Sequence, residues 1–301
     1  QVHRDDLLED SFTQVHAMNT GELRRWLRVQ FVGEPGVDAG GLEREWFLLV
    51  TRALFDPSAG LFAPQRNGAF SINPASGVAN EMHLEYFRFT GRVLGKVLME
   101  HTVAPYNLSL PLLKHFLGLP LTFSDIEFTD SDLYRNLRWL RDNPGAAALG
   151  LDFTVTMESF GAKEVVELKP GGRNLAVTDN NKEEYLKLRL KHLMLDSIRE
   201  QLWHLLKGFY DVIPTHLISV FDYQELELLL CGIPEIDVAE WKSHCRYLGD
   251  YRRQGDEHPV IQWFWEVVET FSEEEKARFL QFCTGTSRLP PHGFKALQVD
   301  D

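Results

Sequence analysis

Apolar residues recur every three or four positions in several long stretches of the chain, which is the spacing of one face of an α-helix. This spacing predicts helices at residues 5–18, 42–54, 83–99, 110–116, 133–140, 180–208, 223–230 and 259–271. The stretch at 83–99 is apolar on more than one face, so we expect this helix to lie at the centre of a core. The pattern therefore predicts a mostly helical chain.

Polar residues at the starts of the predicted helices support them, because their side chains can satisfy the free amides of the first turn. Three pairs have the required spacing, namely Thr129 with Asp132, Asn180 with Glu183, and Ser272 with Glu275. The third pair opens a further helix near the end of the chain. Elsewhere, Gly232 follows the helix at 223–230, where glycine can adopt the left-handed conformation that closes a helix.

Two regions show the patterns of β-strands. Residues 27–32 alternate between apolar and polar side chains, as a half-buried strand does. Residues 144–178 contain β-branched runs that are separated by turns, at 153–155, 165–168 and 175–177. We interpret this second region as a small inserted sheet, and we expect a mixed α+β fold.

Acidic residues outnumber basic residues, with 44 Asp and Glu against 31 Lys and Arg and a formal net charge of -13. This charge repels phosphate backbones and anionic lipid headgroups, so we expect no nucleic-acid partner and no direct membrane contact. No apolar run is long enough to span a bilayer, and the first residues lack a signal-peptide pattern. We expect a soluble protein of the cytoplasm, with the nucleus as a second location.

Three cysteines without paired spacing argue against a secreted disulfide framework, and the histidines are scattered without a metal-binding pattern. We therefore expect no metal and no organic cofactor. Cys231 and Cys283 adjoin apolar runs, and we interpret them as buried structural side chains. Cys245 lies between His244 and Arg246, whose charges would lower its pKa only if they faced the thiol, but adjacent residues rarely point the same way and the sequence shows no orienting acid, so Cys245 is a weak candidate.

Several motifs, in order along the chain, resemble those of one family. In the first half they lie at residues 36–42 (GVDAGGL), 45–47 (EWF), 83–84 (HL), 86–87 (YF) and 91–92 (GR). In the second half they lie at residues 222–232, 260–265 (VIQWFW), 280–282 (LQF) and 284–288 (TGTSR). Together they resemble the catalytic domain of HECT-type ubiquitin ligases from about residue 5 to residue 297. The subgroup that the chain most resembles carries C2 and WW domains upstream.

The resemblance implies a fold of two lobes. The N-terminal lobe is expected at residues 1–235, with a small inserted subdomain for the conjugating enzyme at about 144–210. A hinge is expected at 236–256, and the first, incomplete part of the C-terminal lobe at 257–301. The polar, turn-rich character of residues 232–256 fits a connection between lobes.

The resemblance also implies a two-step reaction, in which ubiquitin passes from a conjugating enzyme to a ligase cysteine as a thioester and then to a lysine. The implied partners are a ubiquitin-conjugating enzyme, ubiquitin and protein substrates. In the family this cysteine stands in a Thr-Cys-Phe motif, beyond the segment that matches Gly293–Leu297. None of the three cysteines matches that motif. We therefore expect the catalytic cysteine beyond Asp301, assign no catalytic residue, and expect this segment to be inactive alone.

Two binding sites follow from the same resemblance. The implied conjugating-enzyme site is an apolar set made of Leu133, Leu137, Leu149 and Leu151. The alternative interpretation is that these leucines belong to the core. The implied ubiquitin site is at Phe160, where the usual aromatic partner is replaced by Ala59. The alternative function is a non-catalytic module that binds a conjugating enzyme or ubiquitin without turnover, which a Thr-Cys-Phe motif after Asp301 would exclude.

Overall fold

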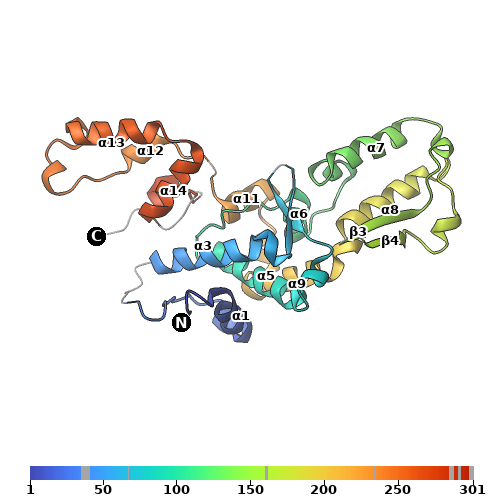
Figure 1. Cartoon of the computed structure of the whole chain (residues 1–301), viewed down its shortest axis with the longest axis horizontal. Helices are drawn as coiled ribbons and strands as arrows, with labels where there is room; N and C mark the ends of the chain where they lie inside the picture. Colours follow the sequence, from blue (N-terminus) through green and yellow to red (C-terminus); the bar gives the residue numbers. More distant parts are fainter. Residues whose placement is uncertain are drawn as a thin grey trace. The chain divides into compact units, whose positions relative to one another are not determined.

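The computed structural model describes residues 1–34, 41–66, 68–159, 162–233, 235–284, 288–290 and 293–297. Its helices are α1 (Leu7–Ala17), α2 (Thr20–Leu23), α3 (Gly41–Phe55), α4 (Ser76–Ala79), α5 (His83–Met99), α6 (Leu110–Leu117), α7 (Ser131–Asp142), α8 (Lys182–Met194), α9 (Arg199–Val212), α10 (Thr215–Ile218), α11 (Tyr223–Cys231), α12 (Val238–Ser243), α13 (Pro259–Glu269) and α14 (Glu273–Thr284) (Figure 1). Its strands are β1 (Phe62–Pro64), β2 (Phe70–Ile72), β3 (Thr154–Ser159) and β4 (Ala162–Glu167). The predicted fold class, mixed α+β and mostly helical, is confirmed.

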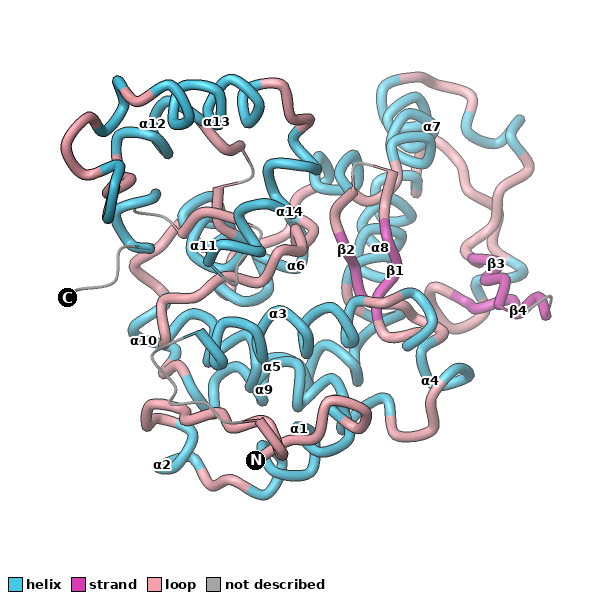
Figure 2. The backbone as a smooth tube through the Cα atoms, turned by 60° about the vertical axis from the view of Figure 1, so that its left-hand side comes forward, coloured by secondary structure: helices cyan, strands magenta, loops and turns pink. Residues whose placement is uncertain are grey.

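Two separate antiparallel pairs, β1 with β2 and β3 with β4, account for the named strands (Figure 2). The strands predicted at 27–32 and 175–177 are wrong. The first segment is held to the N-terminus by a single bridge between Val2 and Phe31, and the second by one between Asp152 and Ala176. Alternation of side chains was present in both segments, but no neighbouring strand extends the pairing beyond a single bridge.

The long helix predicted at 180–208 is two helices, α8 and α9. Leu195 lies outside helical geometry at φ -138° and ψ -59°, and the 3₁₀ turn Asp196–Ile198 follows it. The hydroxyl of Ser197 donates to the carbonyl of Leu193 at 3.3 Å, which gives the backbone an alternative to the helical ladder. Apolar spacing continues across both helices, so the interruption leaves no trace in the periodicity.

The predicted caps are partly correct. The pair of Ser272 and Glu275 forms the expected reciprocal capping box, with the Ser272 amide donating to Glu275 at 2.9 Å. Gly232 closes α11 with φ 71°, as predicted. Helix α7 begins at Ser131, two residues before the predicted start, and Asp130 caps it instead of Thr129, by accepting from the amides of Asp132 and Leu133.

The described chain forms two compact units. The first unit contains residues 1–55, 89–107 and 208–301, and the second contains 56–88 and 108–207. Helices α5 and α9 contribute residues to both units. The lobe boundaries drawn from the sequence stay a prediction.

Close helix packing in the first unit depends on Gly95 of α5. A Cβ atom at this position would lie 2.8 Å from the Cβ of Val212 in α9, which is shorter than a side-chain contact allows. Nearby, Arg92 forms an ion pair with Asp211 at 2.8 Å and donates to the Val15 carbonyl. The prediction that α5 lies at the centre of a core is confirmed, because Phe89, Val93 and Val97 are fully buried.

Helices α12, α13 and α14 lie together in the first unit and share one apolar cluster (Figure 1). Trp241 of α12 packs against Trp265 of α13, with ring centroids 6.1 Å apart. Ile236 and Val238 are also buried in this cluster, although the sequence places them in the predicted hinge. The mostly exposed part of the predicted hinge is residues 246–257. The indole of Trp265 in α13 donates to the hydroxyl of Tyr247 in this part at 2.9 Å.

No described helix has the length and apolar character needed to cross a membrane. Among the described residues, no group of three or more His, Cys, Asp or Glu side chains is arranged to hold a metal ion.

Candidate functional site

Helix α7 in the second unit carries two of the predicted site leucines. The carboxylate of Asp130 accepts from the amides of Asp132 at 3.1 Å and Leu133 at 2.9 Å, so the helix starts at a fixed point. Leu133, Leu137 and Leu140 are spaced by four and three residues, which places them on one face of the helix. That face packs against a core cluster.

The core cluster below α7 contains nine buried residues, Ile126, Leu137, Leu140, Ala146, Phe153, Val177, Tyr185, Leu186 and Met194. The rings of Phe153 and Tyr185 meet edge to face with centroids 5.5 Å apart. Leu133 and Leu151 are partly buried and pack against the same cluster. Three of the four predicted leucines therefore meet at one cluster.

The four leucines differ in what they offer to a partner. Leu137 is only 5% exposed and belongs to the core cluster, which is the alternative interpretation that the sequence left open. Leu149 is 44% exposed, at the end of the 3₁₀ turn Ala146–Leu149, and is not among the residues of that cluster. A partner would therefore touch Leu149 and the edges of Leu133 and Leu151.

The turn that carries Leu149 is held in place by Asp179. Its carboxylate accepts from the amides of Gly145 at 2.9 Å and Ala146 at 3.2 Å, and these two bonds hold the pKa of Asp179 below its usual range. Gly145 at φ 93° and Gly150 at φ 62° bracket the turn in left-handed conformations that favour glycine. The exposed position of Leu149 is thus fixed by the backbone on both sides.

The exposed side of α7 carries arginines that form ion pairs with aspartates. Asp132 is shared by Arg135 and Arg66, and Asp142 is shared by Arg141 and Arg138. The pKa of Asp132 is lowered chiefly by Arg135, and that of Asp142 chiefly by Arg141. Asp130 at the start of the helix and Glu183, which acts on Arg141, add further negative charges beside these four arginines.

The sequence interpretation missed one exposed aromatic residue on α7. Trp139 is 49% exposed, because it lies off the face formed by Leu133, Leu137 and Leu140. A large aromatic residue outside the apolar stripe of an amphipathic helix is the signal that would have indicated it. The predicted ubiquitin-binding residue, Phe160, lies outside the described residues.

The three cysteines differ in burial. Cys231 is buried as predicted, and its thiol donates to the carbonyl of Tyr106 at 3.1 Å. The prediction that Cys283 is buried is wrong: it is exposed on α14, because successive helical residues point about 100° apart and the apolar run cannot all face the core.

The neighbours of Cys245 in the sequence do not lower its pKa, in keeping with its weak candidacy as a nucleophile. Burial raises the pKa of the Cys245 thiol, and the nearby Cys283 and Asp256 raise it further. The ring of His244 instead lies against the carbonyl of Glu240, with Nδ1 2.9 Å from that oxygen. Partial desolvation likewise raises the pKa of Cys283.

Comparison with known proteins assigns the family. The model of the HECT domain (ubiquitin-transferase) matches residues 48–300. The chain belongs to the HECT-domain family.

The relatives that match are ubiquitin ligases. The chain is 44% identical to the E3 ubiquitin-protein ligase UPL1 of Arabidopsis thaliana, 42% identical to the E3 ubiquitin-protein ligase Nedd-4 of Drosophila melanogaster and 43% identical to the human E3 ubiquitin-protein ligase HECW1. Each match covers 99% of this chain. The chain spans 8%, 29% and 18% of these relatives, respectively.

Proposed function

We propose that this chain forms part of a HECT-type ubiquitin ligase, which accepts ubiquitin from a conjugating enzyme as a thioester and passes it to substrate lysines. The family match over residues 48–300 carries this proposal. The names of the relatives support it, since each is an E3 ubiquitin-protein ligase. A thiol suits this chemistry because thioester exchange costs little, whereas the later attack by an amine on a thioester is favourable.

We infer that none of the three cysteines of this chain is the thioester-forming residue. A nucleophilic cysteine needs an accessible thiol with a stabilised thiolate. Cys231 is buried, and the pKa values of Cys245 and Cys283 are raised, which lowers the thiolate fraction at neutral pH. The nucleophile is therefore expected on a cysteine in the Thr-Cys-Phe context typical of the family, which none of the three matches.

We infer further that the conjugating enzyme docks on the second unit at Leu133, Leu149 and Leu151. Exposed Leu149 beside half-buried leucines gives an apolar surface that an aromatic side chain of the partner can cover. Trp139 and the arginines of α7 form a rim around such a contact. The leucines predicted from the resemblance thus keep their proposed role, except that Leu137 supports the surface from the core.

The competing function is a binding module without turnover, and the raised thiol pKa values favour it for these 301 residues taken alone. The distinguishing experiment mixes the chain with activating enzyme, conjugating enzyme, ATP and ubiquitin, and resolves the products on a non-reducing gel. We expect no reductant-sensitive ubiquitin adduct on the 301-residue chain, and an adduct once the chain is extended through a Thr-Cys-Phe motif. An adduct on the 301-residue chain that disappears in Cys245→Ser or Cys283→Ser would show that the nucleophile is misassigned. Failure of the extended chain would favour the binding module.

A further inference from the structure

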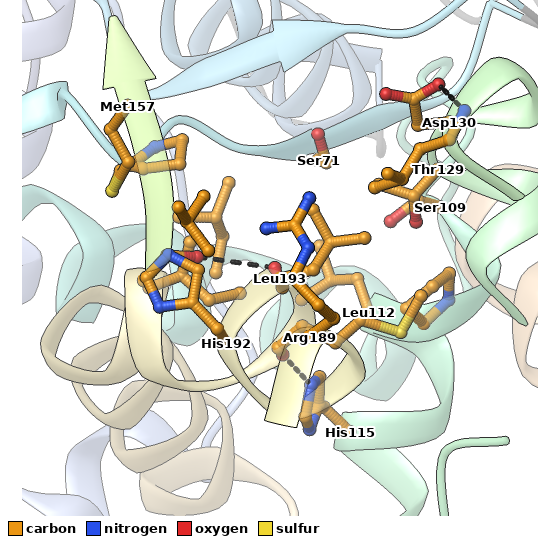
Figure 3. Close-up of a pocket in the computed structure, with 18 residues that line it drawn as sticks. Ser71, Ser109, Leu112, His115, Thr129, Asp130, Met157, Arg189, His192 and Leu193 are labelled. Atoms are coloured by element: carbon orange, nitrogen blue, oxygen red, sulfur yellow. Dashed lines mark hydrogen bonds between the residues drawn. The ribbon is translucent and has the colours of Figure 1, made fainter. Parts of the chain in front are cut away.

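The second unit contains a pocket of about 350 Å³ that is partly open to solvent (Figure 3). Strands β2 and β3, helices α6 and α8 and the start of α7 contribute its walls. Most of the lining is apolar, with Leu112, Leu133, Met157 and Leu193 as its larger side chains. Its volume lies at the lower end of the range for small-molecule sites, which are mostly apolar with a few polar groups.

Arg189 places a positive charge inside this apolar space. Figure 3 shows its guanidinium in the middle of the ring of lining side chains, on the side of Ser71. The Nε atom of Arg189 is buried without a hydrogen-bond partner, and the described residues provide no ion pair to the guanidinium. Arginine keeps its proton, so the buried Nε–H needs an acceptor from outside the chain, which is either an anion or a water.

The other titratable groups of the cavity do not neutralise Arg189. Asp130 carries the one carboxylate among the described lining residues, and it already accepts two amide hydrogens at the start of α7. Burial lowers the pKa of His192, and Arg189 lowers it further. Burial also lowers the pKa of His115, whose Nε2 lies 2.8 Å from the Met194 carbonyl oxygen. Both histidines are therefore neutral at pH 7.

The acidic residue beside the end of α8 is likewise engaged. Asp196 pairs with Lys191 at 3.3 Å and with Arg199, so it does not serve as the counter-ion of Arg189. The pocket therefore combines apolar walls, one guanidinium whose buried Nε–H has no partner, and neutral polar groups. A guanidinium fork matches the two oxygens of a carboxylate, and apolar walls favour a monoanion over a doubly charged phosphate, which costs more to desolvate.

We propose that this cavity binds an amphipathic carboxylate, with the carboxylate on Arg189 and an apolar body against Leu112, Leu133 and Met157. Two sources share this chemistry, a free carboxylic acid with a short apolar chain and a glutamate side chain flanked by apolar residues in a peptide. The proposal does not depend on ubiquitin transfer, because it rests on the pocket and on the unpartnered Nε of Arg189, although Leu133 belongs both to this pocket and to the proposed docking surface.

The test titrates the complete 301-residue chain with sodium octanoate in a calorimeter at pH 7.4. Methyl octanoate and 1-octanol, which have the apolar body without the charge, serve as matched ligands, and inorganic phosphate supplies charge without the apolar body. An N-acetyl, C-amidated Leu-Glu-Leu peptide distinguishes the peptide source from the free acid. We expect binding of octanoate or of the peptide, and at least tenfold weaker binding of both uncharged ligands and of phosphate.

The variants isolate the role of the guanidinium. Arg189→Gln should weaken octanoate binding at least tenfold. The octanoate affinity of Arg189→Lys should lie between those of the unsubstituted chain and Arg189→Gln, because lysine keeps the charge but lacks the planar fork of donors. Arg173→Gln, which removes an exposed arginine of the same unit, should leave the affinity unchanged. Circular dichroism checks that each variant is folded.

Several results would overturn the proposal. These are no binding of either carboxylate at millimolar concentration, equal binding of methyl octanoate, equal octanoate binding by Arg189→Gln, and tighter binding of phosphate than of octanoate. If Arg189→Gln does not fold, comparing the binding of octanoate and methyl octanoate to the unsubstituted chain still tests whether the carboxylate is required.

Discussion

Leu137 and Leu149 were predicted to have the same role, but the structure places them in different surroundings. Both are leucines of the set implied by the family resemblance, but Leu137 is 5% exposed and Leu149 is 44% exposed. Position on a helix face predicts burial only when the neighbouring elements are known, and those elements are distant in sequence. For Leu137, the cover includes Phe153 and Tyr185. The sequence therefore could not tell which of these leucines are buried in the core and which are exposed.

For these two residues, we predict that substitution by alanine changes the free energy of unfolding by different amounts. Leu137→Ala should lower the free energy of unfolding by about 2 to 5 kcal/mol, because it leaves a cavity in the core cluster. Leu149→Ala should change it by about 0.5 kcal/mol or less, since the side chain is largely in solvent. Urea unfolding followed by circular dichroism measures both. A loss at Leu149 as large as that at Leu137 would contradict the assigned burial.

Elements were predicted best where the pattern was local. The bounds of α5 follow directly from its apolar spacing, and the box of Ser272 and Glu275 from its two polar residues. Elements were predicted worst where their form depends on a distant partner, as at 27–32, where a strand would need an adjacent strand. The break between α8 and α9 at Leu195 was missed because the apolar period continues across it.

The cavity could not be predicted at all from local patterns. It is lined from β2, α6, α7, β3 and α8, which are far apart in the sequence. Arg189 by itself is an ordinary polar residue of a helix, and only the packing of the other elements around it removes its partners. Single charges inside assembled cavities have no signature in periodicity.

At the scale of the whole molecule, buried histidines make the stability of the second unit depend on pH. Burial lowers the pKa values of His83, His115, His192 and His204, all of which lie in that unit. In the unfolded chain each binds a proton near pH 6.5, whereas the folded chain binds it only at lower pH. As pH falls below about 6.5, the unfolded state therefore gains protons first, and stability is lost.

We predict that the urea concentration at the midpoint of unfolding decreases as the pH is lowered from 7.5 to 5.5. Asp132, Asp142 and Asp179, whose pKa values are lowered, add a further loss only near and below pH 4, because their unfolded values are about 3.9. His192→Gln should reduce the slope between pH 7.5 and pH 5.5, since it removes one of the four titrations. A midpoint that is constant or rises over this interval would contradict the neutral state assigned to these histidines.

For the whole molecule, the central proposal is that a ubiquitin-conjugating enzyme docks on the second unit at the surface around Leu149. The most direct test measures the dissociation constant of a purified conjugating enzyme for the complete chain and for Leu149→Asp. Leu217→Asp, which places the same charge at an exposed leucine of α10, is the matched control. We expect Leu149→Asp to weaken binding by about tenfold or more, because a charge would be buried in an apolar contact. Leu217→Asp should bind as the unsubstituted chain does. Unchanged affinity in a folded Leu149→Asp variant, or equal loss in both variants, would contradict the proposed docking surface.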